Sequence, residues 1–383
     1  MPMLIGIDAS RANKKQKTGV EWYAFHLIQA LKQITLSDGN HWVLYTREPL
    51  TGGLEDLPEN WYEVRAGWSP KYLWTKIRMS WEMWRRPADI LFVPAHVLPP
   101  FRPEHSVVTV HDVGFRRYPQ FYKPIQKLYH ERSTKDIVRS RARIIAPSEF
   151  TGRELVDLYH ADASRIAITH LGIDHALYRP IEDGTAIQAV LGKYRIPRPY
   201  FLYIGRLEEK KNIVNLIKAF DVFKKHRGVG DPTVLVLAGP KGYGYEAIKK
   251  QISDSPNQKQ IMEIGYVPEA DVPHLLSGAR GYIQISWYEG FGIPPVQAMA
   301  CGCPVIAANN SAMPEILGEG NALFVSPKGI DAIAQSMDHL IANEGLVRDL
   351  REKGIRQAKN YTWEKTAKET LPVITQWLGM RRS

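Results

Sequence analysis

Short apolar runs rich in β-branched residues alternate with helical patterns along this chain, and the alternation occurs twice. The runs cover residues 4–8, 42–45, 90–93, 107–110, 144–146 and 166–169 in the first half, and 200–204, 233–237, 261–264, 281–285 and 304–307 in the second. Strands at such intervals, with helices between them, are typical of parallel sheets with crossover connections. The sequence therefore predicts an α/β protein with two Rossmann-like parallel-sheet domains.

The boundary between the halves lies in residues 172–199, where five residues interrupt any long periodic pattern: Pro180, Gly184, Gly192, Pro197 and Pro199. This composition is typical of a linker. We predict an N-terminal domain over residues 1–178 and a C-terminal domain over 179–362, followed by a helix in 363–383 that is broken or kinked at Pro372 and packs near the domain junction. Ligands bind at the carboxyl ends of such strands, so two facing domains predict a deep interdomain cleft.

The net charge of the chain limits the kinds of binding partner that we expect. The chain of 383 residues has 50 Lys and Arg against 40 Asp and Glu, a formal net charge of +10. This surplus favours a nucleic acid, an anionic lipid or a phosphorylated small molecule. No stretch approaches the roughly 18 to 20 apolar residues of a membrane-spanning helix, and no signal peptide is recognisable. Cys301 and Cys303 are too close for an ordinary disulfide and too few for a zinc site, so we expect a cytoplasmic protein.

The sequence lacks the phosphate-binding motifs of the common nucleotide enzymes. It contains no GxxxxGK(S/T) loop and no GxGxxG pattern after the first strand. Gly239, Gly242 and Gly244 come nearest, but they lie in a later loop with a different spacing. D-x-D, HExxH and CxxC patterns are also missing, which disfavours metal-held pyrophosphate. A phosphorylated ligand is then expected to be held by the protein's own cations and backbone amides.

Two βα loops of the second half carry residues for such chemistry. The first, GRLEEKKN at 205–212, follows a strand and opens a helix. Arg206 offers a planar fork for bidentate phosphate contacts and Lys211 a mobile point charge, so together they can hold a diphosphate without metal. The alternative for this segment is a solvated loop whose charges pair with one another.

The second loop is SWYEGFGIPPVQAM at 286–299, where a strand ends and Pro294 or Pro295 starts a helix. Its glycines let the backbone approach a ligand, and the free amides of the helix face the loop. The carboxylate of Glu289 can accept hydrogen bonds from hydroxyl groups. The alternative is that Glu289 only caps the helix.

At these residues the chain resembles the retaining glycosyltransferases of family 4, which have the GT-B fold. The E-x7-E signature of that family corresponds to Glu289 and Gln297 within YEGFGIPPVQAMACGCPVI. GRLEEKKN resembles the phosphate site of the family, VLAGP, GYVPEADVPHLL and NNSAMPEIL its other C-terminal blocks, and TGVEWYAFHLIQAL, VTVHDVGFRRYP and APSEFTGREL its N-terminal ones. The second acid of the signature is replaced by Gln297, which has hydrogen-bond donors as well as an acceptor and changes the geometry available for ribose binding.

The resemblance implies that one set of residues binds a nucleotide-sugar donor: Gly19, Arg206, Lys211, Tyr266, Val267, Glu289, Phe291, Gly292, Ile293 and Gln297. The two cations would hold the diphosphate, which the amide at position 19 approaches. Glu289 and the amides at 291–293 would bind the transferred sugar, and Gln297 the ribose. The nucleobase would pack at 266–267, where core packing is the alternative.

The resemblance also implies roles for His111 and Asp112. His111 ends a strand and would hydrogen-bond a hydroxyl of the donor sugar, although a lone histidine is more often structural. Asp112 would orient His111 or the acceptor hydroxyl, and a local turn is the alternative. The expected reaction is a front-side displacement with retention, in which Arg206 and Lys211 stabilise the leaving diphosphate and its oxygen takes the acceptor proton. The implied catalytic residues are therefore His111, Arg206, Lys211 and Glu289, with no metal or other cofactor.

Two further segments are basic. Residues 71–86 place Trp74, Ile77, Trp81 and Trp84 at helical spacing among lysines and arginines. This pattern fits a helix on an anionic membrane surface, or one that packs its tryptophans on the first sheet. The loop 13–17 has three lysines on the expected acceptor side, and both segments would suit a lipid-linked acceptor.

The predicted function is that of a metal-independent hexosyltransferase acting on a glycan or lipid-linked glycan. EGFGIPP and HDVGFRRYP are most similar to bacterial mannosyltransferases of polysaccharide assembly, so GDP-mannose is the favoured donor and a UDP-sugar the next. The alternatives are a sugar-nucleotide epimerase of the same fold, for which no acid and base pair is identified, and a basic nucleic-acid-binding protein, for which no recognised module is visible. We expect no nucleic-acid partner, and a location in the cytoplasm or at the inner face of the cell membrane.

Overall fold

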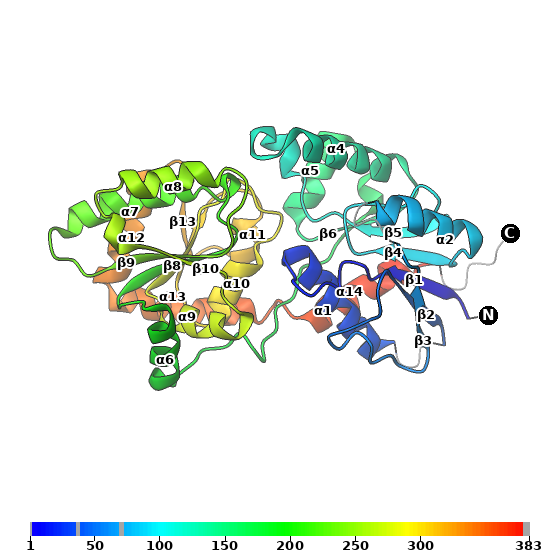
Figure 1. The fold of residues 1–383 in the computed structure, drawn as a ribbon, viewed down its shortest axis with the longest axis horizontal. Coiled ribbons are helices and arrows are strands. Elements are labelled where there is room, and N and C mark those ends of the chain that lie inside the picture. The colour runs from blue at the N-terminus through cyan, green and yellow to red at the C-terminus, as the bar shows by residue number, and fades with distance from the viewer. Residues whose placement is uncertain (1, 36–38, 69–72, 378–383) are drawn as a thin grey trace. The chain divides into compact units, whose positions relative to one another are not determined.

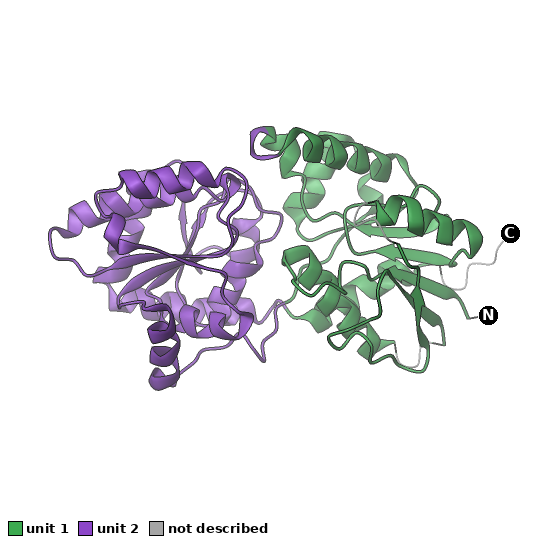
Figure 2. Cartoon of the chain, in the orientation of Figure 1, with its two compact units in different colours: residues 1–119, 123–172, 362–383 green, residues 120–122, 173–361 purple. Residues whose placement is uncertain are grey.

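The computed structural model describes residues 2–35, 39–68 and 73–377 (Figure 1). The chain divides into two compact units (Figure 2). Unit 1 consists of residues 1–119, 123–172 and 362–383, and unit 2 of residues 120–122 and 173–361. The main change of unit therefore falls between Gly172 and Ile173, while the sequence pattern places it after residue 178.

Within the described residues, unit 1 contains seven strands in the order β3-β2-β1-β4-β5-β6-β7, and all neighbours are parallel. The strands are β1 (Leu4–Asp8), β2 (His41–Thr46), β3 (Trp61–Arg65), β4 (Ile90–Val93), β5 (His105–Thr109), β6 (Arg143–Ala146) and β7 (Ile166–Ile168). The sequence predicts six of them and misses β3. This strand lies at the sheet edge, where Glu63 and Arg65 interrupt the apolar pattern.

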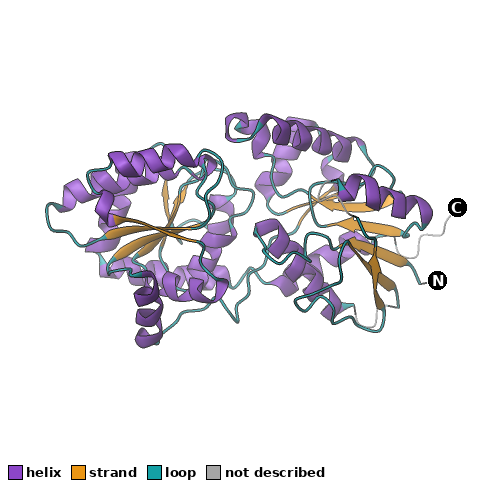
Figure 3. Cartoon of the chain, in the orientation of Figure 1, coloured by secondary structure: helices purple, strands orange, loops and turns teal. Residues whose placement is uncertain are grey.

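Helices cover the two faces of this sheet (Figure 3). They are α1 (Gly19–Ile34), a π-helical turn η1 (Trp74–Met79) that continues into α2 (Ser80–Arg85), α3 (Gly114–Arg117), α4 (Pro124–Arg139), α5 (Glu149–Tyr159) and α14 (Trp363–Thr375), with 3₁₀ turns η2 (Pro119–Phe121) and η3 (Ala163–Arg165). The helix α14 runs through Pro372 to Thr375, so it is not broken there. It packs against α1, where the ring of His26 stacks on that of Trp363 at 5.1 Å.

Unit 2 has six strands within the described residues, again all parallel, in the order β10-β9-β8-β11-β12-β13. They are β8 (Tyr200–Ile204), β9 (Val234–Ala238), β10 (Ile261–Gly265), β11 (Gly281–Gln284), β12 (Val305–Ala308) and β13 (Leu323–Val325). The sequence predicts the first five to within one residue at each end. It misses β13, a strand of three residues at the edge of the sheet.

The helices of unit 2 are α6 (Gly184–Tyr194), α7 (Ile213–Arg227), α8 (Tyr245–Asp254), α9 (Val272–Gly278), α10 (Ile293–Ala300), α11 (Met313–Leu317), α12 (Ile330–Ala342) and α13 (Glu344–Ala358), with 3₁₀ turns η4 (Glu209–Lys211), η5 (Gln258–Gln260) and η6 (Glu269–Asp271). The interpretation of residues 172–199 as a linker is wrong over α6. Asp183 caps this helix by accepting hydrogen bonds from the amides of Thr185 and Ala186. The cap starts the helix despite Gly184 at its first position.

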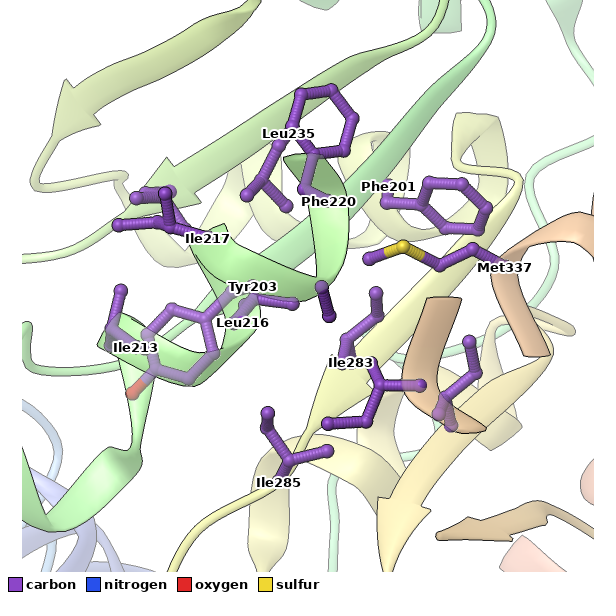
Figure 4. Close-up of a cluster of buried hydrophobic side chains, with 14 of the residues drawn as sticks. Phe201, Tyr203, Ile213, Leu216, Ile217, Phe220, Leu235, Ile283, Ile285 and Met337 are labelled. Carbon is purple, nitrogen blue, oxygen red and sulfur yellow. The ribbon is translucent and has the colours of Figure 1, made fainter. Parts of the chain in front are cut away.

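The core of unit 2 lies between the sheet and helices α7 and α12 (Figure 4). It contains Phe201, Tyr203, Leu235, Ile283 and Ile285 from the sheet side, Ile213, Leu216, Ile217 and Phe220 from α7, and Met337 from α12. Burial of each large apolar side chain contributes about 1.5–3 kcal/mol. Because α7 begins at Ile213, this packing holds residues 205–212 at the carboxyl end of β8.

Candidate active site

The strand order of unit 2 reverses between β8 and β11, which are neighbours in the middle of the sheet. In doubly wound sheets, ligands bind beside the carboxyl ends of the strands at such a reversal, because the two following loops diverge there. The loop 205–212 follows β8 and the loop 285–292 follows β11. Both candidate loops of the second half therefore open at the same point.

The loop after β8 is supported by the glycine-rich loop 239–244. A Cβ on Gly239 would lie 2.0 Å from the carbonyl oxygen of Gly205, and one on Gly242 would lie 2.7 Å from Cγ of Arg206. The Tyr203 hydroxyl donates to the carbonyl of Arg206 at 3.1 Å. Gly239 and Gly242 lack a Cβ and thus leave room for the basic loop 205–212.

Arg206 and Lys211 differ in their surroundings. The side chain of Arg206 is exposed and forms no ion pair with any residue in the part of the chain that the structure describes. Nζ of Lys211 lies 2.7 Å from Oε1 of Glu289, and their side chains are 18% and 12% exposed. Arg206 therefore does not fit the alternative of a loop whose charges pair with one another. Lys211 does form an ion pair, but its partner lies in the other candidate loop.

Asn212 brings Lys211 to Glu289. Its backbone is left-handed, with φ of 61°, and its buried side-chain amide donates to the carbonyls of Ile285 at 3.0 Å and Pro327 at 2.7 Å. Asparagine tolerates this conformation better than most residues. The two hydrogen bonds tie the loop after β8 to the end of β11 and to the segment after β13.

The carboxyl group of Glu289 is ionised at neutral pH. Burial alone would raise its pKa, but the positive charges of Lys211 and Lys210 outweigh this effect, and the pKa is lowered. Glu289 does not cap α10, because the N-cap position is Gly292 and no side chain caps this helix. The carboxylate is therefore a hydrogen-bond acceptor beside a cation.

Sequence reasoning missed one residue of this site, Gln284. Its Nε2 donates to Oε1 of Glu289 at 2.6 Å and to Oγ of Ser286 at 2.9 Å. Gln284 ends β11 and is 2% exposed. The only available signal was a polar residue within an otherwise apolar strand.

The rest of the loop after β11 leads into α10. This helix begins at Ile293, one or two residues before the predicted start at Pro294 or Pro295. Because prolines lack an N–H, Pro294 and Pro295 reduce the amides available at its first turn. Gly292 has φ of 91°, and a Cβ there would lie 2.3 Å from Cε of Met313. Phe291 is buried with its ring against that of Tyr361, whose centroid is 5.4 Å away.

Gln297, Tyr266 and Val267 lie on separate elements of unit 2. Gln297 is in the second turn of α10 and partly exposed. Tyr266 and Val267 follow β10, and their exposed fractions are 68% and 7%. Core packing therefore describes Val267, while the ring of Tyr266 is accessible to a ligand.

In unit 1, His111 and Asp112 follow β5. Nε2 of His111 lies 3.3 Å from the carbonyl oxygen of Pro94, and its ring meets that of Tyr23 edge-on at 4.8 Å. Burial lowers the pKa of His111, so the imidazole is neutral at pH 7. Oδ1 of Asp112 accepts from the amide of Gly114 at 3.0 Å, which is the local turn considered as its alternative.

Gly19 is the first residue of α1. Thr18 and Glu21 form a capping box at this helix start. A Cβ at Gly19 would meet nothing within 4 Å, so space remains above the helix N-terminus. Nζ of Lys14, in the basic loop 13–17, lies 2.8 Å from Oε1 of Glu21, and these contacts together lower the pKa of Glu21 to about 2 although burial would raise it.

The tryptophans of the basic helical segment have different environments. Residues 71 and 72 lie outside the described residues. Trp74 is buried, and its Nε1 donates to Oδ1 of Asp8 at 3.2 Å. Trp81 and Trp84 are 44% and 67% exposed, and Ile77 is 46% exposed. Of these four side chains, Trp74 alone packs on the first sheet, and the other three are exposed.

The described part of the chain contains no helix with the length and apolar character needed to span a lipid bilayer.

Residues 192–360 match the family described as Glycosyl transferases group 1, and residues 17–177 match the one described as Glycosyltransferase Family 4. The O-antigen chain mannosyltransferase B of Escherichia coli is 30% identical over 295 residues, which cover 77% of this chain and 76% of that protein. The serotype-specific mannosyltransferase WbdA of Escherichia coli is 23% identical over 235 residues, 61% of this chain but only 29% of that protein.

The fold is also similar to that of solved structures. Sucrose-phosphate synthase from Thermosynechococcus elongatus superposes with a TM-score of 0.76 at 18% identity, covering 99% of this chain and 100% of that one. The two doubly wound sheets and both family matches agree with this likeness. The chain therefore belongs to the family 4 glycosyltransferases and has the GT-B fold.

Proposed function

We propose that this glycosyltransferase moves mannose from GDP-mannose to a glycan or lipid-linked glycan, with retention of the anomeric configuration. The observation that carries the proposal is the ion pair of Lys211 and Glu289 at the strand-order reversal of unit 2, beside the exposed Arg206. A cation and a carboxylate at this point suit a ligand with both phosphates and hydroxyls. The choice of mannose is supported by the mannosyltransferase that is 30% identical to the chain.

The proposed roles divide the donor among these side chains. Arg206 binds the diphosphate with its planar guanidinium, and Lys211 adds a second positive charge, so that no metal ion is required. Glu289 accepts hydrogen bonds from hydroxyls of the transferred sugar. Gln297 bonds the ribose, and Tyr266, which is 68% exposed, offers its ring to the nucleobase.

The proposed reaction is a front-side displacement. The bond between the anomeric carbon and the diphosphate breaks, and a bond from the acceptor oxygen forms on the same face of the sugar. The acceptor proton passes to the departing phosphate oxygen, whose charge Arg206 and Lys211 stabilise. His111, neutral because burial lowers its pKa, hydrogen-bonds a hydroxyl of the sugar.

The test is incubation of the protein with GDP-mannose, UDP-glucose, UDP-galactose and ADP-glucose, each with and without a mannose-containing oligosaccharide. We expect acceptor-dependent release of GDP and a product with the anomeric configuration of the donor, read by proton NMR. Release of nucleoside diphosphate from a UDP-sugar but not from GDP-mannose would refute the assigned donor. A product of opposite anomeric configuration would refute retention. Turnover of no donor would refute the proposed function.

Peripheral contact with an anionic membrane is the second part of the proposal. The exposed rings of Trp81 and Trp84 lie on α2 beside basic side chains, and the guanidinium carbons of Arg78 and Arg85 are 4.6 and 5.2 Å from the centroid of the Trp81 ring. Indole rings settle at the headgroup level of a bilayer, while cations favour anionic lipid. A lipid-linked acceptor would be presented at such a surface.

A further inference from the structure

Gln284 lies at the centre of a buried hydrogen-bond chain that ends on Glu289. Its side-chain oxygen is 2.6 Å from the hydroxyl of Tyr282, and its nitrogen is 2.9 Å from Oγ of Ser286 and 2.6 Å from Oε1 of Glu289. Tyr282 and Gln284 are both on β11, which lies between β8 and β12. The chain is thus attached to a central strand of the sheet.

The chemistry of the partners determines how the Gln284 amide is oriented. An ionised carboxylate can only accept hydrogen bonds, so the nitrogen of Gln284 must face Glu289. The oxygen of the amide then faces Tyr282, whose hydroxyl donates to it. The second proton of the nitrogen is directed at Ser286, which in turn donates to Glu289 and helps to lower its pKa. Both donors of the amide are therefore used.

Lys211 and Gln284 converge on the same oxygen of Glu289, Oε1, at 2.7 and 2.6 Å. A carboxylate held through one oxygen by donors from two elements cannot rotate about its terminal bond without losing both contacts. Neither Lys211 nor Gln284 occupies Oε2. The pair of contacts therefore sets where Oε2 lies.

We propose that Gln284 is a positioning residue that holds the carboxylate of Glu289 in the orientation in which it binds hydroxyls of the transferred sugar. Lys211 provides a positive charge beside the carboxylate. Gln284 orients the carboxylate without adding a charge that would also attract the phosphates. The inference rests on the proposed function, because it assigns Glu289 to the donor sugar. Gln284 itself touches neither sugar nor nucleotide.

The central test compares Gln284→Met with Gln284→Glu. Gln284→Met keeps the volume but removes the donor, and we expect turnover to fall about 10- to 100-fold, the usual effect of a lost hydrogen bond to a buried charge. Affinity for GDP, measured by calorimetry, should stay within about threefold, because the diphosphate site is intact. A Gln284→Met protein with wild-type turnover would overturn the proposal.

The pH dependence of turnover in Gln284→Glu distinguishes a positioning role from a purely structural one. The introduced carboxyl group faces Glu289, and the repulsion between two carboxylates in contact raises the pKa at which the second of them ionises. On acidification the introduced group takes up a proton and donates it in a hydrogen bond to Glu289. Turnover of Gln284→Glu relative to wild type should therefore rise at least about tenfold from pH 8 to pH 6, while the ratio for Gln284→Met stays constant. A ratio for Gln284→Glu that does not change with pH would overturn the proposal.

A second pair of variants keeps the test decisive if Gln284→Met does not fold. Tyr282→Phe removes the hydroxyl that holds the Gln284 amide, and Tyr200→Phe removes a hydroxyl of the same sheet that donates to the carbonyl of Leu275 at 2.6 Å. We expect turnover to fall several-fold in Tyr282→Phe and to stay at the wild-type level in Tyr200→Phe. Equal turnover of the two variants would contradict the inference.

Failure of the proposed function is recognised separately. It would appear as a wild-type protein that turns over no nucleotide sugar. In that case, the ratio of the affinity for a nucleotide sugar to the affinity for the bare nucleotide still measures the contribution of Glu289 to sugar binding. Gln284→Met should lower this ratio, and an unchanged ratio would refute the positioning role.

Discussion

Nζ of Lys211 lies 2.7 Å from Oε1 of Glu289, although the two residues are 78 positions apart in the chain. This ion pair joins the loop after β8 to the loop after β11. Both side chains are less than one-fifth exposed, so solvent and salt screen the pair only weakly. The positive charge of Lys211 therefore favours the ionised form of Glu289.

Replacement of Lys211 should make stability depend on pH in a defined direction. The lowered pKa of Glu289 gives the wild type stability that is present above the unfolded pKa of about 4.3 and is lost as pH falls through the folded pKa. In Lys211→Met, burial dominates and raises that pKa, so the ionised carboxylate destabilises the fold. We expect a loss of about 3 kcal/mol at pH 7.5 that narrows towards pH 5, measured by urea unfolding. Lys353→Met, which removes an exposed pair with Asp349, is the control, and a deficit independent of pH would contradict the coupling.

Arg206→Ala should lower turnover by about 10²-fold or more, because the guanidinium is assigned to the leaving diphosphate. The unfolding midpoint should hardly change, since the side chain is exposed. Steady-state release of nucleoside diphosphate measures the effect. Arg356→Ala, at an exposed position of α13, serves as the control. Turnover of Arg206→Ala within a few-fold of wild type would remove Arg206 from the site.

His111→Ala should reduce turnover about 10- to 100-fold with little change in GDP affinity, because His111 is assigned to the sugar. Burial lowers the pKa of this imidazole below its ordinary value, so it should add no step to the pH–rate profile between pH 7 and pH 8. His339→Ala on the exposed side of α12 is the matched control. A protonation step near pH 6.5 that disappears in His111→Ala would show that the imidazole acts as an acid or base.

Gly239→Ala and Gly192→Ala should change stability in opposite directions. The first places a Cβ 2.0 Å from a backbone oxygen, at a φ of 140°, and should cost about 1–3 kcal/mol. The second adds a methyl group within α6 that meets nothing within 4 Å, and should gain about 0.5–1 kcal/mol. Denaturant unfolding measures both. Gly239→Ala should also lose turnover through Arg206, and wild-type turnover would show that the basic loop does not need this support.

The double variant Trp81→Ser/Trp84→Ser should bind vesicles of anionic phospholipid at least about tenfold more weakly than wild type, because both indoles are lost from the interface. Neither protein should sediment with neutral phosphatidylcholine vesicles. Tyr243→Ser, which removes an aromatic side chain that is 41% exposed in unit 2, is the control. Equal binding of the wild type to both kinds of vesicle would refute the membrane contact.

Most strands that the sequence predicts are mainly apolar, as β8 and β9 are, although β10 contains Glu263 and β11 ends in Gln284. The edge strand β3 is interrupted by charged residues, the sequence does not distinguish the short edge strand β13 from a loop, and the two glycines of α6 obscure its helical pattern. Local composition therefore detects long, mainly apolar strands more reliably than short strands at a sheet edge or helices that contain glycine.

The candidate site could be predicted in part for a similar reason. Arg206, Lys211 and Glu289 each follow a strand, and the position after a parallel strand is a local property of the sequence. The contact of Lys211 with Glu289 depends on β8 lying next to β11, which is a property of strand order. Gln284 contacts Glu289 from the strand that precedes the same loop, and the only local sign of this contact is a polar residue in an otherwise apolar strand.

The helix α14 completes unit 1, although residues 173–361 separate it from the rest of that unit. During synthesis at about 5–20 residues per second, the part of unit 1 that ends at Gly172 must wait roughly 10 to 40 seconds for α14 to emerge. Unit 2 is continuous over that interval and can bury its own core. The order of maturation on the ribosome is therefore reversed: the unit translated second is finished first, and the surface where His26 meets Trp363 stays open to chaperones until translation ends.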